Sequence, residues 1–235
     1  MPSSPGRCFL LFVLSTLALL AVPSAASPAG QIVIYGSQSG SHLTLTTKGS
    51  NVVVEGKMAG THPKGCHLSG DRMVAVCKLA GADAIELSMG PSGDSIDVAD
   101  PMPIPVTAYL GPGSDKMIGN AEMDTCYSQG SRRNRCIGGG GNDVCITGEK
   151  NSDCVGGTGN DYCETSDGSD GCWGGPGNDV CRMGPGEDGC HGEGGNDRLY
   201  GGANVDQLYG GPGFDYCDGG LGPGQSHECN AGPRH

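Results

Sequence analysis

Residues 156–164 read GGTGNDYCE, and units of this length follow one another without a gap from Gly138 to Asp218. Nine units fill that span. The sixth position is aspartate in every unit except one, which has Ser152. The eighth position is cysteine in every unit except two, which have leucine. A short fixed period means that one structural unit is stacked on itself, so the fold is an array and not a conventional globular domain.

Each unit combines a turn with a short strand. Its first six residues are rich in glycine, which tolerates positive φ, so they can turn tightly and expose backbone carbonyls. Its last three residues can form a strand whose middle side chain, at the eighth position, points inward while its neighbours face out. Two units then make one flattened coil of eighteen residues. Residues eighteen apart are stacked about 4.8 Å from each other, and residues nine apart lie on opposite edges.

The unit resembles the GGxGxDxUx signature of the RTX nonapeptide family, also called haemolysin-type calcium-binding repeats. Residues 156–164, 174–182 and 210–218 match every named position, except that cysteine replaces the large apolar residue U. Clear matches cover roughly residues 110–218, and weaker ones extend back to Gly81. The resemblance implies an all-β, right-handed parallel β-roll (a β-helix of nine-residue repeats) that holds calcium ions in the turns between successive coils.

The turns on the two edges of the coil are unequal. The first edge has turns close to the ideal sequence, which end in Asp143, Asp161, Asp179, Asp197 and Asp215. Calcium takes six to eight oxygens, mixing carboxylates with backbone carbonyls, so two stacked turns are needed for one ion. We therefore predict ions between the turns at 143/161, 161/179, 179/197 and 197/215. The residues that represent the backbone contribution are Gly156, Gly159, Gly174 and Gly177.

The second edge is predicted to bind ions only towards its C-terminal part, between Asp170 and Asp188 and between Asp188 and Asp206. Its N-terminal part, with the uncharged Asn134 and Ser152, is predicted to be empty, and basic residues take over charge neutralisation there. These basic residues are Arg132, Arg133 and Lys150. The alternative for any of these aspartates is a turn-capping role, in which the carboxylate accepts hydrogen bonds from nearby amides. Binding at two eroded upstream turns, at Asp115 and Asp124, is left open.

Composition points to a secreted, acidic protein. The chain has 235 residues, 45 of them glycine and only 5% aromatic, which cannot build a large globular core. Residues 1–26 have the pattern of a signal peptide: Arg7, an apolar run too short to span a membrane, and a small-residue cleavage site. Without them the chain has 13 basic and 26 acidic residues, a net charge of −13. Such a chain has little tendency to fold alone, and a divalent ion would link binding to folding. The composition also argues against nucleic acid as a partner.

Twelve cysteines remain after residue 26, an even number that favours disulfides in an extracellular protein. Stacked cysteines are expected about 4.8 Å apart and cysteines on opposing sheets about 10 Å apart, so the bridges are predicted between neighbouring coils. The predicted pairs are Cys126–Cys145, Cys163–Cys181, Cys136–Cys154, Cys172–Cys190, Cys217–Cys229 and Cys66–Cys77. The alternative is that some cysteines are free thiols packed as small hydrophobes.

The remaining chain is predicted to form a β-rich N-terminal cap at 27–80, the repeat domain at 81–218 and a C-terminal cap or tail at 219–235, with almost no helix. Strands are expected at Gln31–Tyr35, Leu43–Thr47 and Val52–Glu55. A bulged loop is expected at 100–105, and one inserted residue near Ser128.

We do not expect an enzyme. The nearest nucleophile motif, GSQSG at residues 36–40, has glutamine where the catalytic serine would stand, so Ser37 and Ser39 are interpreted as turn residues. No HExxH zinc motif is present. The sequence thus predicts a secreted, extracellular calcium-binding β-roll stapled by disulfides. The alternative is a cell-surface adhesive or ligand-binding arm that uses Trp173, Tyr200 and Tyr209 as contact residues. An isolated outward residue such as His191 is expected to be solvated.

Overall fold

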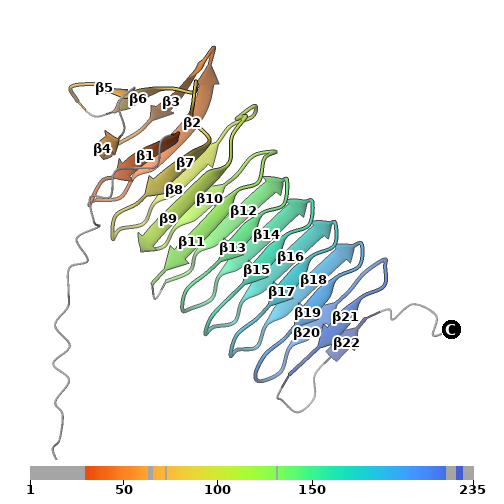
Figure 1. The fold of residues 1–235 in the computed structure, drawn as a ribbon. Coiled ribbons are helices and arrows are strands. Elements are labelled where there is room, and N and C mark those ends of the chain that lie inside the picture. Colours follow the sequence, from red (N-terminus) through yellow and green to blue (C-terminus); the bar gives the residue numbers. More distant parts are fainter. Residues whose placement is uncertain (1–29, 63–65, 72, 131, 221–225, 230–235) are drawn as a thin grey trace, which may run out of the picture.

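A computed structural model describes residues 30–62, 66–71, 73–130, 132–220 and 226–229. The predicted signal peptide and most of the predicted C-terminal tail lie outside these residues. Every regular element within the described part is a β-strand, as expected, and the strands form two long sheets. Figure 1 shows these sheets as the two faces of one elongated coil.

The ten-stranded sheet contains mostly odd-numbered strands, stacked from one end of the molecule to the other. Its strands are β1 (Gln31–Gly36), β4 (Met58–His62), β7 (Ala84–Ser88), β9 (Val106–Pro112), β11 (Thr125–Gln129), β13 (Val144–Ile146), β15 (Tyr162–Glu164), β17 (Val180–Arg182), β19 (Arg198–Tyr200) and β21 (Tyr216–Asp218).

The twelve-stranded sheet faces it and contains mostly even-numbered strands. Its strands are β2 (His42–Lys48), β3 (Asn51–Glu55), β5 (Cys66–Leu68), β6 (Val74–Lys78), β8 (Ser95–Val98), β10 (Lys116–Ile118), β12 (Arg135–Gly140), β14 (Asp153–Thr158), β16 (Gly171–Pro176), β18 (Gly189–Gly194), β20 (Gln207–Tyr209) and β22 (Ser226–Glu228).

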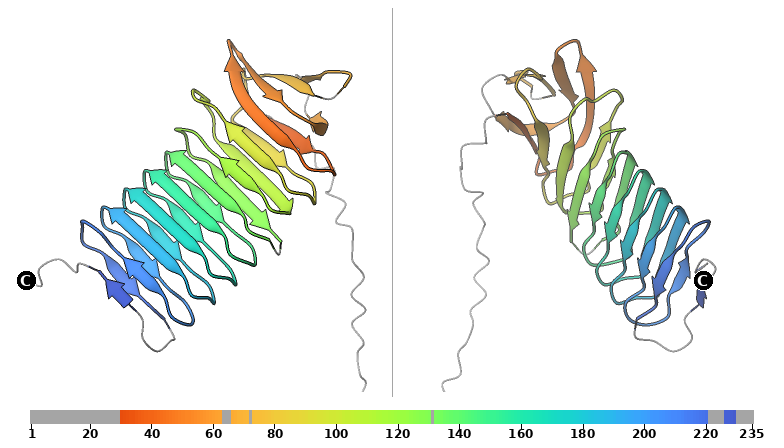
Figure 2. Two further views of the ribbon diagram at one scale, coloured as in Figure 1. Left: turned by 180° about the vertical axis from the view of Figure 1, so that it is seen from behind. Right: turned by 45° about the vertical axis from the view of Figure 1, so that its right-hand side comes forward.

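From β7 onward the chain alternates between the two sheets, and each strand pairs in parallel with the strand one coil away. The register is eighteen residues in the repeats, so that Cys163 lies beside Cys181. The predicted coil is confirmed. We call the row of turns that lead from the twelve-stranded to the ten-stranded sheet the first edge, and the opposite row the second edge; Figure 2 shows the regular stacking of both.

The N-terminal strands continue both sheets. The predicted strands near 31, 43 and 52 are observed as β1, β2 and β3. β1 pairs in parallel with β7, and β2 pairs in parallel with β8, so both belong to the coil. β3, β4, β5 and β6 are antiparallel additions at this end.

The inserted residue lies in the segment from Ser128 to the start of β12. β9 and β11 pair eighteen residues apart up to Tyr127, whereas β10 and β12 pair nineteen apart, with Lys116 beside Arg135. The extra residue therefore lies between Tyr127 and Arg135 and accounts for the nineteen-residue spacing from Asp115 to Asn134. A separate bulge in the β9–β11 pair sets Leu110 and Gly111 of β9 opposite the buried Ser128.

The core changes character along the coil. Its N-terminal part contains fully buried aliphatic side chains, such as Ile34, Leu43 and Ile85. From β11 onward the interior is a narrow file of eighth-position side chains, six of which are buried cysteines between Cys145 and Cys190, followed by Leu199 and Leu208. The predicted inward orientation of the eighth position is thus confirmed, although Cys217 is only partly buried.

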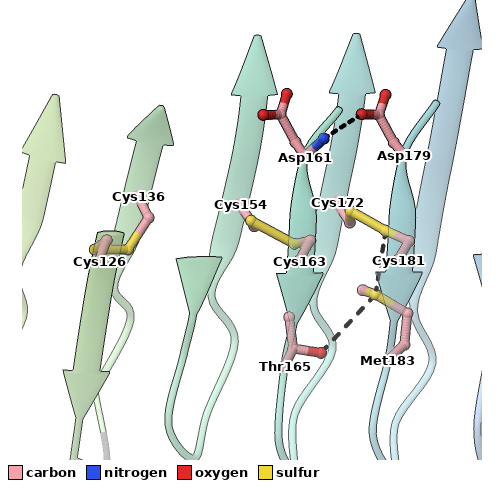
Figure 3. The surroundings of a disulfide bond; sticks show 10 residues. All are labelled: Cys126, Cys136, Cys154, Asp161, Cys163, Thr165, Cys172, Asp179, Cys181 and Met183. Carbon is pink, nitrogen blue, oxygen red and sulfur yellow. Dashed lines mark hydrogen bonds between the residues drawn. A yellow bond between two sulfur atoms is a disulfide. The ribbon is translucent and has the colours of Figure 1, made fainter. Parts of the chain in front are cut away.

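Four of the six predicted disulfides are wrong. The two terminal bridges, Cys66–Cys77 and Cys217–Cys229, are present as predicted. In the repeats, however, the bridges cross from one sheet to the other, and Figure 3 shows them inside the coil. They are Cys126–Cys136, Cys154–Cys163 and Cys172–Cys181, and the buried Cys145 and Cys190 are free.

The reason is the width of the coil. The Cα atoms of the three cross-sheet pairs are 6.1 to 6.6 Å apart, well below the roughly 10 Å typical of two packed sheets with larger side chains. Tight glycine turns and small interior residues let the sheets approach this closely. Stacked cysteines such as Cys145 and Cys163 are neighbours in one sheet, so their side chains point in the same direction and not at each other.

No helix in the described part of the chain has the length and apolar character needed to cross a membrane.

Candidate metal centre

The first edge carries a continuous ladder of aspartates. The backbone N–H of Asp161 donates to Oδ1 of Asp179 at 2.7 Å, and Figure 3 shows this bond between adjacent coils. The same bond links Asp143 to Asp161 and Asp179 to Asp197. The remaining rungs run from Asp124 to Asp143 and from Asp197 to Asp215. The five aspartates predicted for this edge are therefore stacked in one row, as expected.

The ladder uses only one oxygen of each carboxylate. The second oxygen, Oδ2, is buried and has no hydrogen-bond partner in Asp143, Asp161, Asp179, Asp197 or Asp215. Turn-capping predicts a carboxylate satisfied by amides, which explains Oδ1 and leaves Oδ2 unexplained. A buried, unpaired anionic oxygen is costly unless a cation or a proton neutralises it.

The first glycine of each turn makes room for this oxygen. A Cβ at Gly156 would collide with Oδ2 of Asp161, and a Cβ at Gly174 would collide with Oδ2 of Asp179. On the first edge the first position of the repeat is therefore restricted to glycine by space, because an added Cβ would overlap Oδ2 of the aspartate.

The glycine at the fourth position of each first-edge turn lies against a backbone carbonyl of the preceding coil. A Cβ at Gly159 would collide with the carbonyl oxygen of Gly141, and one at Gly177 with that of Gly159. Gly159 also has a φ of 133°, in the region that favours glycine. Carbonyl and carboxylate oxygens thus gather in the same stacked turns. The four predicted glycines are placed in these turns, two beside carboxylates and two at carbonyl contacts.

Burial changes the protonation of the ladder. The pKa of Asp143 and Asp179 is raised to about 7, mainly by desolvation; backbone N–H donors oppose this rise, and neighbouring carboxylates such as Asp161 contribute to it. Desolvation also raises the pKa of Asp161 and Asp197. In the metal-free fold Asp143 and Asp179 therefore resist full ionisation near neutral pH.

An asparagine ladder runs beside the aspartates on the outside of the first edge. The backbone N–H of Asn160 donates to Oδ1 of Asn142 at 2.7 Å, and Asn178 and Asn196 continue the series. These bonds run from each coil back to the preceding one, opposite to the aspartate bonds. The fifth residue thus holds turn to turn independently of any ion, a role that the sequence analysis missed although the repeated Asn-Asp pair was visible.

The second edge has the same ladder in its C-terminal part. Asp170 donates its N–H to Oδ1 of Asp188 at 2.7 Å, and Asp188 donates to Asp206 at 3.1 Å. Desolvation raises the pKa of Asp188 to about 7. Oδ2 of Asp188 is buried and has no hydrogen-bond partner. The three predicted residues of this edge are therefore stacked in order.

The middle of the second edge lacks carboxylates, as predicted from Asn134 and Ser152. Ser152 accepts no ladder bond but donates its N–H to Oδ1 of Asp170 at 2.6 Å. Arg132, Arg133 and Lys150 are exposed. Arg133 forms a salt bridge at 2.8 Å with Asp153 of β14, so its charge neutralises a surface carboxylate beside the turns.

Upstream, Asp94 and Asp115 on the second edge share the buried, unpaired Oδ2 of the repeats. Asp124 on the first edge does not, because its Oδ1 accepts the N–H of Val106 and its Oδ2 accepts the N–H of Asn120. Sequence reasoning left Asp115 and Asp124 open and did not consider Asp94 as a ligand. The available signal was the similarity of residues 89–94, MGPSGD, to residues 183–188, MGPGED.

The donor set suits calcium. It offers hard oxygen ligands only, carboxylate and backbone carbonyl, in turns that repeat at each coil. The unpaired Oδ2 atoms are the specific observation that fits a cation. The residues that would hold it are the aspartates of adjacent turns and the carbonyl-bearing glycines between them, and the ion would neutralise their charge.

The serines of the near-miss nucleophile motif hold a turn. The Ser37 hydroxyl donates to the Gly40 carbonyl at 2.8 Å, and the Ser37 N–H donates to Oγ of Ser41 at 2.7 Å. Ser37 is buried.

The predicted aromatic contact residues do not share one surface. Trp173 and Tyr209 lie on the twelve-stranded sheet, whereas Tyr200 lies on the ten-stranded sheet. The expectation that His191 is simply solvated is wrong. It is half-buried between Trp173 and Tyr209, with ring centroids 6.0 and 4.8 Å away.

A comparison with known protein families agrees with the stacked Gly-Asp turns described above. Residues 155–181 and 191–224 match the model of the RTX calcium-binding nonapeptide repeat, in four copies. The matched ranges contain the first-edge turns from Asp161 to Asp215. The turns at Asp94, Asp115, Asp124 and Asp143 lie outside them. Comparisons with curated proteins and with solved structures gave no match.

Proposed function

Because the chain carries four RTX calcium-binding nonapeptide repeats between residues 155 and 224, we propose that it is a secreted calcium-binding β-roll protein whose folding is coupled to the ions. The observation that carries this proposal is the row of buried Oδ2 atoms without partners. Calcium ions between the turns at 143/161, 161/179, 179/197 and 197/215 would satisfy them. Further ions belong between Asp170 and Asp188 and between Asp188 and Asp206.

The charge of the chain supports the coupling of binding to folding. A net charge of −12 favours an expanded metal-free chain. Folding brings the ladder aspartates within backbone hydrogen-bond reach of one another, which adds repulsion unless protons or cations neutralise them. Calcium, which binds the folded turns and not the expanded chain, stabilises the coil by mass action.

The experiment is a calcium titration of the purified chain without residues 1–26, followed by far-UV circular dichroism and by native mass spectrometry. We expect the β-sheet signal to rise cooperatively in the range of about 10⁻⁴ to 10⁻³ M calcium typical of extracellular modules. Several bound ions should be found per chain. A protein with an unchanged spectrum and no bound calcium at millimolar concentration would refute the proposal. Magnesium is the matched control, because it demands a tighter octahedral geometry.

Secretion is part of the proposal. The pattern of residues 1–26 and the disulfides in the coil both suit an oxidising compartment. Fusion of residues 1–30 to a reporter should direct its export, whereas replacing Leu14 and Leu17 by arginine should retain it in the cell. We also propose that the protein has no hydrolytic activity of its own.

The adhesive-arm alternative has one supporting observation. The stacked Trp173, His191 and Tyr209 form an aromatic row across adjacent strands of one sheet face. A pull-down against cell-surface glycans, with Trp173→Ala compared to wild type, tests this alternative. Loss of a captured glycan in the variant would support it, and equal capture would place the binding elsewhere.

A further inference from the structure

Two turns outside the matched repeats are built like the turns that we assign to calcium. Residues 89–94 connect β7 to β8, and residues 110–115 lead from β9 to β10. β8 and β10 pair in parallel, so these two turns are adjacent on the second edge. Their sequences, MGPSGD and LGPGSD, share the Gly-Pro and the final aspartate with MGPGED at residues 183–188.

Their carboxylates form the same ladder. Oδ1 of Asp115 accepts the backbone N–H of Asp94 at 2.8 Å, and Oδ1 of Asp94 accepts that of Ser41 at 2.6 Å. Both aspartates are 3% exposed. Oδ2 of each is buried and has no hydrogen-bond partner. This is the same combination that marks Asp161 and Asp179.

Their backbones are also arranged alike. A Cβ at Gly111 would collide with the Gly90 carbonyl, and one at Gly113 with the Ser92 carbonyl. The corresponding contacts in the later second-edge turns join Gly184 to the Ser166 carbonyl and Gly186 to the Gly168 carbonyl. The second and fourth positions of the two turn pairs therefore present carbonyl oxygens in the same way.

We propose that turns 89–94 and 110–115 bind one hard divalent cation, calcium, through Oδ2 of Asp94 and Asp115 and the carbonyl oxygens of both turns. This site is separated from the C-terminal part of the second edge by the uncharged Asn134 and Ser152. The ion would also fix the turn between β1 and β2 to the coil, because Oδ1 of Asp94 accepts the backbone N–H of Ser41 in that turn. The site binds the same cation as the sites of the proposed function, on which it rests, but it uses none of their residues.

The test compares the double variant Asp94→Asn/Asp115→Asn with wild type and with Asp97→Asn, a half-buried residue of β8 that lies outside both turns. Native mass spectrometry of the mature chain at millimolar calcium should count one ion fewer in the double variant and no loss in Asp97→Asn. An unchanged count in the double variant would overturn the proposal.

A second measurement needs no variant. Amide hydrogen exchange of the wild-type chain is compared with and without calcium. We expect calcium to slow exchange in peptides that cover residues 89–115 as well as in those that cover 138–218. Protection of the second region alone would overturn this site and leave the proposed function intact. No protection in either region would count against both.

The interior cysteines carry an independent inference. The free Cys145 and Cys190 are separated by two bridges, Cys154–Cys163 and Cys172–Cys181. The sulfurs of Cys145, Cys154 and Cys163 all lie within 4.8 Å of one another, and so do those of Cys163, Cys172 and Cys181. Each bridge therefore has the sulfur of another interior cysteine beside it: Cys145 lies beside the Cys154–Cys163 bridge, and Cys163 lies beside the Cys172–Cys181 bridge. We call this row of interior sulfurs the column.

We infer that the disulfides shift along this column by one cysteine. Cys145 loses its proton to water, and its thiolate attacks Sγ of Cys154. The Cys154–Cys163 bond breaks, and Cys163 leaves as a thiolate. Cys163 then attacks Cys172 and releases Cys181, which takes up a proton. The number of bridges is unchanged, so these steps need no oxidant.

The shift brings the two free thiols together. Cys181 and Cys190 are nine residues apart, the spacing of the two bridges in the repeats. A low-molecular-weight disulfide then oxidises them, accepting two electrons and leaving as two thiols. The product, with Cys126–Cys136 retained, has all eight interior cysteines paired. The shift requires the open, metal-free coil, because Cys145 and Cys190 are buried in the fold, where neither water nor a low-molecular-weight disulfide reaches them.

The experiment incubates the chain with a calcium chelator and oxidised glutathione, and then maps disulfides by mass spectrometry after cleavage at Asp and Glu residues, which separate these cysteines. We expect Cys145–Cys154, Cys163–Cys172 and Cys181–Cys190. In the control Cys145→Ser, the Cys154–Cys163 and Cys172–Cys181 bridges should persist. Recovery of Cys145 and Cys190 as free or glutathionylated thiols in the wild-type chain would overturn the inference.

Discussion

At the scale of single residues, each ladder aspartate has two separate roles. Oδ1 of Asp179 holds the backbone N–H of Asp161, and Oδ2 lies buried over Gly174. An asparagine can keep the first role, because its side-chain oxygen also accepts a hydrogen bond. It replaces the second oxygen by an NH₂ group, which cannot bind a cation. Asp→Asn substitutions therefore separate the ladder from the ion.

The position of an aspartate in the row sets how many ions depend on it. Asp179 lies between two proposed sites, whereas Asp215 belongs to one. We predict that Asp179→Asn lowers the ion count by two and Asp215→Asn by one, as measured by native mass spectrometry at millimolar calcium. Asp153→Asn, on the outer face of β14, is the control and should keep the wild-type count. Equal losses for Asp179→Asn and Asp215→Asn would contradict a shared-ligand row.

The raised pKa values predict an unusual pH dependence of the metal-free protein. The pKa of Asp143, Asp179 and Asp188 is raised to about 7 in the fold, mainly by desolvation. The folded state therefore holds protons that the unfolded state releases, so their contribution to stability is present below about pH 4 and is lost as the pH rises through about 7. In chelator, the free energy of unfolding from urea titrations should fall between pH 5 and pH 8.

Calcium should abolish this dependence, because the ion replaces the protons. The same urea titrations at millimolar calcium are the control, and they should show the fold at least as stable at pH 8 as at pH 5. A metal-free protein that becomes more stable between pH 5 and pH 8 would show that these carboxylates are not desolvated in the fold.

Much of the site could be predicted at this scale because the repeat fixes residue type by position. The sixth-position aspartates from Asp143 to Asp215 are placed as expected. Asp94 escaped prediction because the twenty-one residues that separate it from Asp115 break the period. The extra residues lie in the loop after β8, so the turn itself kept its construction while the spacing that would reveal it was lost.

At the scale of the elements, the turns are limited by contact between coils. We predict that Gly159→Ala destabilises the calcium-loaded protein by at least roughly 1–3 kcal/mol, the usual cost of a non-glycine residue held at a strained backbone conformation. The collision with the Gly141 carbonyl adds to this cost. The measurement is thermal unfolding at millimolar calcium.

The matched control is Gly189→Ala in β18. Gly189 is half-buried like Gly159, but a Cβ there would meet nothing within 4 Å and its φ is not in the positive region. It should leave the unfolding temperature close to that of wild type. Similar effects of the two substitutions would mean that the turns are looser than described.

The strands were easier to predict than the connections between them. Alternation along β13 to β21 gave the inward cysteines, because a strand has a period of two. The disulfide pairing depends instead on the distance between sheets, which no local pattern contains. That distance results from small interior residues such as Cys154 and Cys163 packed between tight turns, and the predicted interior was too wide.

At the scale of the whole molecule, the two ends are stabilised differently. The N-terminal end has a core of aliphatic side chains, including Ile34 and Leu87, whereas the repeats have a single file of cysteines. Each disulfide contributes about 2–4 kcal/mol, and the ions contribute by mass action. The repeats therefore depend on ions and bridges to an extent that the N-terminal end does not.

We predict that removal of calcium together with reduction of the disulfides unfolds the repeats first. Amide hydrogen exchange in chelator and reductant should then be fast in peptides from 138–218 and slower in peptides that contain β1, β2 and β7. Either treatment alone should have a smaller effect on the repeats. Persistent protection of 138–218 under both treatments would show that the backbone ladders suffice to hold the coil.

The eighteen-residue step of the repeats from β12 onward gives this part of the molecule a fixed length per coil. Excising residues 162–179 would remove one coil and shorten the long axis by about 4.8 Å. Asp161 would then be joined to Val180, and every remaining side chain would keep its original face. Excising nine residues would instead send each later strand to the opposite sheet. Engineered versions of this protein can therefore be lengthened or shortened in whole coils, as spacers that hold two attached groups at chosen separations.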